Sequence, residues 1–339
     1  MNRRTAAALV FSSAGMLVLI LDGKAALLGA QAGVELCLNT VIPSLFPFFV
    51  LSVLLTQSIL GQTMALLRPI GALCRIPRGA ESLVLVGLVG GYPVGAQNIS
   101  RACSAGCLSP SDGSRMIVFC NNAGPAFLFG ILSPLFSNRL IPWLLWGIHI
   151  LSALTVSVLL PGSRTSVSVK RNTGRITLPG AVEKAVKSMA LVCGWIVLFR
   201  MLLSVLERWL LWSVPQPVRI AVAGILELSN GCILLSRLSS EGMRFLFAAV
   251  FLSFGGVCVT MQTISIAGGL SMRLYYPGKL LQALISFLLA AGCQSLFPAN
   301  MRCDVPVPIV AACLLLSVGC AAYMNLKKKC SSFPAASGV

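Results

Sequence analysis

The sequence predicts an all-α polytopic membrane protein, an inverted-repeat, transporter-like bundle with two broken, re-entrant helical elements. Three observations lead to this prediction. The 339 residues are 57% hydrophobic and only 10% charged, with a mean hydropathy of +0.89, so the chain has more apolar surface than one soluble core can bury. The apolar residues form runs of membrane-spanning length. Two of these runs contain nearly the same glycine-bearing phrase.

Spanning helices need about 20 predominantly apolar residues, and continuous runs of that kind recur along the chain. They cover residues 6–28, 41–60, 140–160, 189–211, 218–235, 280–297 and 305–324. The first run lacks a small-x-small cleavage site before a soluble domain, so we expect an uncleaved anchor helix rather than a signal peptide. Two further apolar stretches, 83–97 and 245–270, are interrupted by glycine pairs.

The charge is distributed as in a membrane protein. A net charge of +17 would suggest nucleic acid in a soluble protein, but here the basic residues lie outside the apolar runs. Arg3 and Arg4 precede the first run, and three lysines follow the last, at positions 327–329. The long polar loop and its edges carry Arg164, Lys170, Arg171, Arg175, Lys184 and Lys187. By the positive-inside rule we expect all three groups in the cytoplasm, near anionic lipid, and no nucleic-acid partner.

Cysteine and histidine form no recognisable metal or catalytic set. Most of the 13 cysteines lie singly in apolar runs, where cysteine behaves as a small hydrophobic residue. The close pair Cys103 and Cys107 has no further cysteine or histidine at metal-ligand spacing. For the single histidine, His149, we expect a hydrogen bond between helices. We therefore expect no metal, no cofactor and no enzymatic activity.

The chain divides into four predicted parts. Residues 1–161 form a first membrane repeat with its anchor helix, 162–180 a basic cytoplasmic linker, 181–325 a second repeat, and 326–339 a basic tail. With the N-terminus inside, run 41–60 points inward and run 189–211 outward, as an inverted repeat requires. If run 218–235 crosses completely, however, both glycine-pair segments lie on the same side of the membrane. Either this run does not cross or the repeat is imperfect.

The repeated phrase is the strongest sign of a site. GGYPVGAQNIS at 90–100 returns as GGVCVTMQTIS at 255–265, which pairs Gln97 with Gln262 without a gap. Relative to alanine, glycine costs a helix about 1 kcal/mol and proline about 3. Main-chain groups freed inside hydrocarbon must then be satisfied by protein or by a water-filled cavity. One such break would favour simple helix packing. Two matching breaks favour re-entrant segments, in which the N-terminus of the restarted helix binds a carboxylate.

Two more polar clusters interrupt apolar surroundings. Asn121 and Asn122 precede a Gly-x-Pro break, and Glu227 and Asn230 lie in an otherwise apolar run. An intramembrane carboxylate is a functional candidate. The structural alternatives stay open: the two asparagines could hydrogen-bond neighbouring helices, and Glu227 could pair with Arg200 in the adjacent run instead of serving in coupling.

Five motifs, in order over nearly the whole chain, resemble the nucleoside-recognition, or Gate, family and the sporulation integral membrane proteins within it. They are VIPSLFPFFV, GGYPVGA, FCNNAGP, LELSNG and YYPGKLLQALIS. The resemblance implies a relative of concentrative nucleoside transporters, located in the mother-cell membrane around the forespore, that carries dipicolinic acid towards the spore. Helix N-termini, amides and Arg115 or Lys279 would suit this planar dianion. Family members usually carry lysine after GA, where this chain has Gln97.

We therefore predict transport of a small anionic, dipicolinate-like solute across the lipid bilayer, with a coupling ion, through a site between the two glycine elements. Tyr92 could stack on an aromatic ring. Two alternatives are a nucleoside-type transporter and a non-transporting sporulation scaffold that recruits partners through the basic loop. The predicted site residues are Gly90, Gly91, Tyr92, Pro93, Gln97, Asn121, Asn122, Glu227, Asn230, Gly255, Gly256, Thr260 and Gln262.

Overall fold

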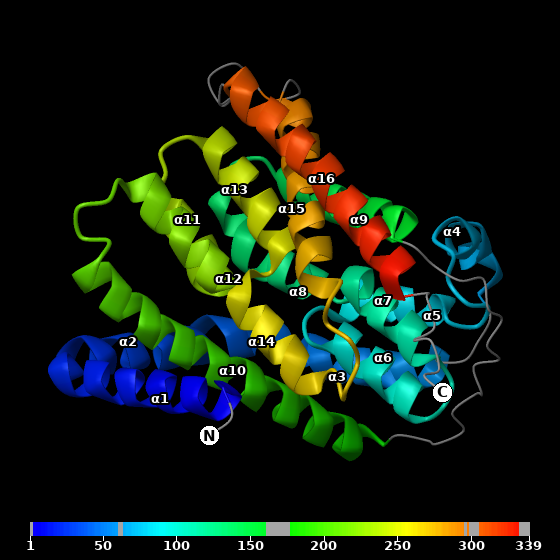
Figure 1. Ribbon diagram of the computed structural model, residues 1–339, viewed down its shortest axis with the longest axis horizontal. Coiled ribbons are helices and arrows are strands. Elements are labelled where there is room, and N and C mark those ends of the chain that lie inside the picture. The colour runs from blue at the N-terminus through cyan, green and yellow to red at the C-terminus, as the bar shows by residue number, and fades with distance from the viewer. Residues whose placement is uncertain (1–2, 60–63, 161–176, 295–296, 298–304, 332–339) are drawn as a thin grey trace, which may run out of the picture.

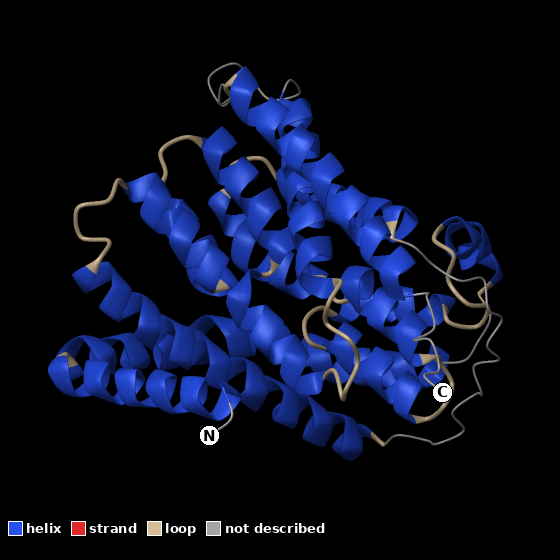
Figure 2. Cartoon of the chain, viewed as in Figure 1, coloured by secondary structure: helices blue, strands red, loops and turns tan. Residues whose placement is uncertain are grey.

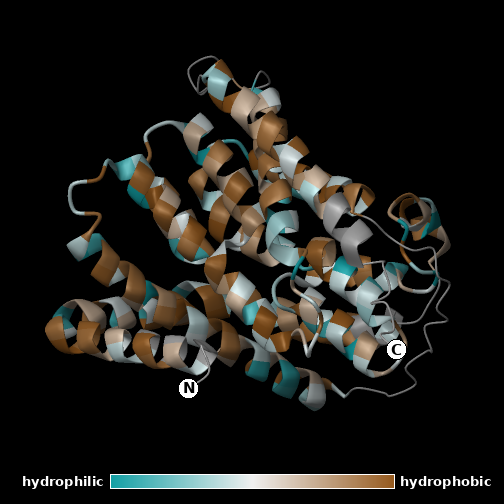
Figure 3. Cartoon of the chain, viewed as in Figure 1, coloured by the Kyte–Doolittle hydropathy of each residue, from teal (hydrophilic) through white to brown (hydrophobic). Residues whose placement is uncertain are grey.

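The computed structural model describes residues 3–59, 64–160, 177–294, 297 and 305–331, and every regular element among them is a helix (Figures 1 and 2). Seven helical segments are long and apolar enough to cross a membrane: Gly23–Leu55, Pro110–Leu135, Ile141–Leu159, Leu178–Trp209, Glu241–Ile266, Tyr275–Cys293 and Val307–Met324. Large apolar side chains stay exposed on these helices, such as Leu28 at 54% and Leu315 at 74%. Hydrophobic residues, coloured brown, occur along most of the helices (Figure 3). The predicted class, an all-α polytopic membrane protein, is confirmed.

The chain begins with α1 (Arg3–Leu21), α2 (Gly23–Leu36), a π-helical turn (Cys37–Val41) and α3 (Ile42–Ile59). Asp22 separates the first two helices, because its carboxylate caps α2 by accepting a hydrogen bond from the backbone N–H of Ala25 at 3.3 Å. The predicted run 6–28 is therefore divided at Asp22. The predicted run 41–60 is the later part of a longer span that starts at Gly23.

The rest of the first half contains two interrupted elements. Its helices are η2 (Ala65–Leu67), α4 (Arg68–Leu73), α5 (Glu81–Gly90), α6 (Val94–Ser104), α7 (Pro110–Cys120), α8 (Pro125–Phe127), η3 (Leu128–Leu132), η4 (Ser133–Leu135) and α9 (Ile141–Leu159). Helices α5 and α6 are each only about 15 Å long, and they pack against one another as a hairpin, named hairpin 1. Segment α7 to η4 is a broken span, named span 1, interrupted between Cys120 and Pro125. Span 1 is absent from the predicted runs because its asparagines, prolines and serines dilute the apolar signal.

The second half has a matching order of elements: α10 (Leu178–Trp209), α11 (Gln216–Leu226), α12 (Leu228–Leu234), η5 (Leu235–Arg237), α13 (Glu241–Phe254), α14 (Gly256–Ile266), α15 (Tyr275–Cys293) and α16 (Val307–Ser331). Helices α11 and α12 fold back on each other at Glu227 to form hairpin 2, with the backbones of Gly224 and Gly231 in contact. Run 218–235, whose crossing the sequence left open, is therefore two short helices rather than one continuous helix of spanning length. Helices α13 and α14 form a second broken span, span 2, interrupted at Gly255.

Polar contacts fix which helix ends lie together. We name one end of the molecule, where α9 ends and α10 begins, the linker end. There the Arg115 guanidinium, at the start of span 1, donates to the carbonyl oxygen of Ser157 near the end of α9, at 2.8 Å. At the same end, Ser271 N–H after α14 donates to Ser114 Oγ at 2.9 Å. At the other end, the distal end, Trp209 Nε1 donates to Asp22 Oδ2 at 2.9 Å. The distal end also holds the hydrogen bond from Ser137 N–H, after span 1, to Glu241 Oε1 at 2.7 Å.

These contacts make the two halves antiparallel. Span α2–α3 runs from the distal end to the linker end, whereas α10 runs back (Figure 1). Spans 1 and 2 are likewise opposed, as are α9 and α15. Hairpin 2 is therefore the counterpart of hairpin 1, and span 2 the counterpart of span 1. The two glycine phrases thus lie in elements of different kinds, hairpin 1 and span 2, and the two halves are inverted with hairpin opposed to hairpin and span opposed to span.

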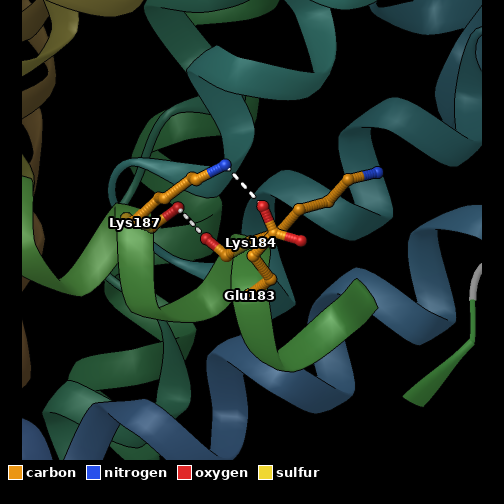
Figure 4. A network of polar contacts seen from close by, with 4 residues as sticks. Glu183, Lys184 and Lys187 are labelled. Carbon is orange, nitrogen blue, oxygen red and sulfur yellow. Dashed lines mark hydrogen bonds and ion pairs between the residues drawn. The ribbon is translucent and has the colours of Figure 1, made fainter. Parts of the chain in front are cut away.

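The basic linker is shorter than the sequence suggests. Lys184 and Lys187 lie in the first turns of α10 rather than in a loop, and Lys187 Nζ pairs with Glu183 Oε1 at 2.6 Å (Figure 4). Both side chains are exposed, so this pair adds little stability. Residues 161–176 of the predicted linker lie outside the described residues. Helix α16 continues to Ser331, and the remaining predicted tail, 332–339, also lies outside them.

Candidate functional site

The four interruptions meet around one buried cavity of about 40 Å³. Hairpin 1 contributes Gly90, Gly91 and Tyr92, and hairpin 2 contributes Glu227, Leu228 and Ser229 to its wall. Spans 1 and 2 add Ala123, Gly124, Val259 and Gln262, and α3 and α10 supply apolar side chains. This volume admits a water molecule or two but not a ring with two carboxylates. The cavity therefore has no room for such a solute in this conformation.

Glycine lets the interruptions approach each other. Gly91 has a φ of +73°, and a Cβ there would lie 2.9 Å from the backbone N of Gly124. Gly255 has a φ of +79°, and a Cβ there would lie 2.8 Å from the Tyr92 hydroxyl oxygen. The Tyr92 hydroxyl also donates to the Leu252 carbonyl oxygen at 3.4 Å, and a cis peptide bond joins Tyr92 to Pro93. Hairpin 1 is thus in direct contact with both broken spans.

Asn121 ties three elements together at the centre. Its Oδ1 accepts a hydrogen bond from the backbone N–H of Ala96 in the first turn of α6, at 3.3 Å. Its Nδ2 donates to Thr263 Oγ1 on α14 at 2.8 Å and to the Tyr275 hydroxyl on α15 at 3.1 Å. Asn121 therefore hydrogen-bonds neighbouring helices, as the structural alternative has it, and its role in a substrate site stays a prediction.

Asn122 holds a buried amine. Lys279 Nζ on α15 donates to Asn122 Oδ1 at 3.0 Å and to Gln282 Oε1 at 2.9 Å, and Gln282 Nε2 donates to the same Asn122 oxygen at 3.1 Å. The Lys279 side chain is 1% exposed, and its Nζ lies 5.4 Å from the centroid of the Tyr92 ring. No carboxylate of the described residues forms an ion pair with it. The Tyr92 ring therefore lines the cavity and also lies near the buried amine.

Glu227 forms the tip of hairpin 2. Its carboxylate accepts hydrogen bonds from the backbone N–H groups of Ser229 at 3.0 Å and Asn230 at 2.7 Å, and from Asn230 Nδ2 at 2.7 Å. The positive end of the α12 dipole stabilises this buried carboxylate. Arg200 instead pairs with Glu207, with 3.5 Å between Nη1 and Oε2, so the alternative of a Glu227–Arg200 pair is wrong.

The two predicted glutamines are not equivalent. Gln262 is buried and lines the cavity, whereas Gln97 Nε2 donates to Ser188 Oγ on α10 at 3.0 Å, away from it. Thr260 donates to the Gly256 carbonyl oxygen of its own helix at 3.1 Å. Gly256 faces the last carbonyl groups of α11. The glycine phrase that is repeated in the sequence therefore does not place these side chains on matching walls of the cavity.

Arg115 and His149 have structural partners. The Arg115 guanidinium donates to the carbonyl oxygens of Cys74, Arg75 and Ser157, which fixes the loop after α4 against α7 and α9. Of the two cations expected to suit an anion, Lys279 alone adjoins the cavity wall. His149 Nδ1 lies 3.1 Å from Ser253 Oγ, so the predicted hydrogen bond between helices is confirmed.

Gln282, Tyr275 and Ser229 were not among the predicted site residues. The signal was present in two motifs, YYPGKLLQALIS and LELSNG, since both place polar side chains at helical spacing beside a proline or carboxylate. Without the fold, the motif that contains Lys279 could not be assigned to the same site as Asn122, which lies 157 residues earlier.

Opposed helical hairpins, together with broken spans whose interruptions meet at a buried polar site, define an inverted-repeat class of polytopic α-helical membrane proteins. The chain is similar to the sporulation integral membrane protein YlbJ of Bacillus subtilis (strain 168), with 26% identity covering 75% of this chain and 74% of that relative. This similarity confirms the predicted resemblance to sporulation integral membrane proteins, whereas membership of the Gate family stays a prediction. No family model matches the chain, and no solved structure matches it significantly.

Proposed function

We propose that this protein is a membrane transporter of a small anionic solute. The observation that carries the proposal is the buried Lys279 amine, which two amide oxygens hold beside the cavity wall and no described carboxylate neutralises. Burying an unpaired cation is costly. An anionic cargo that reaches this amine when Tyr92 moves would supply the missing charge.

The arrangement of hairpins supports transport rather than catalysis or passive scaffolding. Hairpin 1 starts from the linker end and hairpin 2 from the distal end, and their tips meet at the cavity. We propose that both are re-entrant segments, since non-helical backbone at membrane depth is tolerated where protein or a water-filled cavity surrounds it. Opening on one end at a time would then give alternating access to one central site.

The similarity to a sporulation protein favours dipicolinate among small anions, and a mother-cell membrane around the forespore as the location. Dipicolinate has two carboxylates on an aromatic ring. Lys279 can bind one carboxylate, and Tyr92 can stack on the ring. A coupling cation would bind near Glu227, the buried carboxylate of the cavity wall.

Uptake into vesicles that contain the purified protein tests the proposal. We expect saturable uptake of labelled dipicolinate, and a fall of at least about tenfold for Lys279→Gln, because a charge-assisted hydrogen bond contributes about 1.5–3 kcal/mol. The control is Lys187→Gln on an exposed turn of α10, which should transport normally.

Three results would count against the proposal. Uptake of nucleosides but not dipicolinate would favour a nucleoside-type transporter. Unchanged uptake by Lys279→Gln would remove the amine from the site. No uptake of any solute, together with loss of sporulation when residues 162–178 are replaced by a neutral linker, would favour a scaffold.

A further inference from the structure

The imidazole ring of His149 on α9 is buried, and one of its two nitrogens has no partner among the described residues. Nδ1 lies 3.1 Å from Ser253 Oγ on α13, whereas Nε2 makes no hydrogen bond with that part of the chain. Such atoms are rare, because a buried polar group without a partner is costly. In the tautomer that donates from Nδ1 to Ser253, Nε2 has a free lone pair that can take up a proton.

Ser253 and Gln282 lie at one level of the bundle. Helices α13 and α15 run antiparallel, and Ser286 Oγ of α15 donates to the Ala249 carbonyl oxygen of α13 at 2.9 Å. Four residues closer to the linker end, α13 carries Ser253 and α15 carries Gln282. Four residues of helix rise about 6 Å, so these two side chains stay level with each other.

This level holds two basic groups. His149 contacts Ser253, and the Lys279 amine donates to Gln282 Oε1 at 2.9 Å. Helix α9 also packs directly on α15, and Lys279 is close enough for its charge to act on the His149 ring. Each of the two side chains is only 1% exposed. A histidine and a lysine therefore share one buried layer of the bundle.

Within the described residues, no carboxylate forms an ion pair with His149 or Lys279. The elements packed against α9 are α15, α13, α7 and η3. Besides Lys279, their titratable side chains include Asp112, Arg115, Cys120, Glu241, Arg244 and Tyr275. Thiol and phenol groups are uncharged near neutral pH. Glu241 and Arg244 lie at least nine residues before Ser253, and Asp112 and Arg115 lie at the linker end, where Arg115 contacts α9 eight residues after His149. These four charges are thus about 12 Å or more away along the helix axes.

A doubly charged solute would change the charge of this layer. Two adjacent buried cations without an anion are costly, so His149 is neutral while the Lys279 amine is charged. A dianion that binds beside Lys279 leaves one negative charge unbalanced. A proton from the solution, bound at His149 Nε2, removes that imbalance. A monoanion is already balanced by Lys279 and requires no proton.

We propose that His149 takes up a proton when a dianion binds beside Lys279, so that the site favours doubly charged over singly charged solutes. The inference rests on the proposed transport of a small anion, and it names the charge of that anion. It adds to the site an ionisable group distinct from Glu227, whose carboxylate accepts three N–H bonds in hairpin 2. His149 acts through the charge of the layer, as a specificity-determining residue.

The chain has a single histidine, so nuclear magnetic resonance can follow its protonation directly. Protein labelled with ¹⁵N-histidine and purified without a histidine tag should give the ring signals of a neutral imidazole near neutral pH. Dipicolinate, a dianion, should move these signals to the imidazolium positions. Picolinate, which has the same ring with a single carboxylate, should leave them unchanged.

A His149→Gln variant separates proton uptake from binding. Glutamine can still form a hydrogen bond with Ser253 but holds no added proton. We expect dipicolinate binding to weaken by about tenfold or more, because the linked proton no longer contributes. Picolinate binding, measured by calorimetry, should stay unchanged and thereby show that the variant is folded.

The control is Ser152→Ala, three residues further along α9, whose hydroxyl donates to the His149 carbonyl oxygen of its own helix. It should bind both acids as the unchanged protein does. Ring signals that stay neutral with dipicolinate bound, or that are already those of imidazolium without solute, overturn the inference and leave the proposed transport intact. Equal weakening of both acids in His149→Gln overturns it as well. Binding of neither acid by the unchanged protein overturns the inference together with the proposed choice of solute.

Discussion

Two neighbouring asparagines organise the centre of the molecule. Asn121 joins the first turn of α6 to α14 and α15, and Asn122 holds the Lys279 amine. Both side chains are fully buried, so every donor or acceptor left unpaired there would cost about 1–3 kcal/mol. Because buried amides have partners in one arrangement only, they specify how hairpin 1 and span 1 fit together.

Glu227 gives a prediction about coupling. In Glu227→Gln the side-chain oxygen can still accept an N–H bond at the start of α12, so we expect a folded protein. Glutamine neither binds a proton reversibly nor holds a cation as a carboxylate does. Uptake driven by an imposed proton or sodium gradient should therefore fall by about tenfold or more, while solute exchange without a gradient persists. Glu207→Gln, at the Arg200 pair, is the control. Gradient-driven uptake that equals the unchanged protein's would make Glu227 a helix cap only.

Hairpin 2 depends on close backbone contact. A Cβ at Gly231 would collide with the backbone of Gly224, and one at Gly224 with the ring of Phe251. Proline and glycine can end a helix, but they do not by themselves make the chain fold back into a hairpin. It forms because small residues let α11 and α12 pack at short range while Glu227 caps the second helix.

Substitution of Gly231 tests this packing. Gly231→Ala should lower stability by about 1–3 kcal/mol, because the obstructing atoms belong to backbone that cannot rotate away. The matched control is Gly194→Ala within α10, where a Cβ meets nothing within 4 Å and alanine improves helix propensity by about 1 kcal/mol. Thermal unfolding in detergent should show a lower Tm for the first variant and an equal or higher Tm for the second. Equal effects of the two would contradict tight packing in hairpin 2.

The molecule as a whole is built from two antiparallel halves, and this arrangement predicts its orientation. Leu160 and Thr177, which flank the basic linker, and the last turns of α16 lie at the linker end, so the positive-inside rule predicts that this end is in the cytoplasm. An epitope inserted in residues 162–176 should be accessible only from the cytoplasmic side. An epitope at Ser213, between α10 and α11, should be accessible only from the other side. Labelling of both from one side would contradict the antiparallel arrangement.

The order of elements explains which parts of this architecture the sequence could predict. Helices such as α9, α10, α15 and α16 were found because each contains a continuous apolar run of about membrane-spanning length. Hairpin 2 was misread because its two short helices together resemble a weak span. Span 1 was missed because its short helices resemble a polar loop. Whether two short helices continue or fold back depends on contacts such as Gly224 with Gly231, which lie in no single segment.

The sequence by itself determined that the chain is a helical membrane protein with interrupted helices, because the apolar content and the cost of freed backbone groups are properties of each segment alone. It also identified both hairpin tips as candidate sites, through Gly91 and Glu227. Only the tertiary structure decided that Lys279 lies beside Asn122, that Gln97 is remote from the cavity, and that the repeat pairs hairpin with hairpin. These relations depend on packing between distant segments, where antiparallel halves bring residues together without leaving a local pattern.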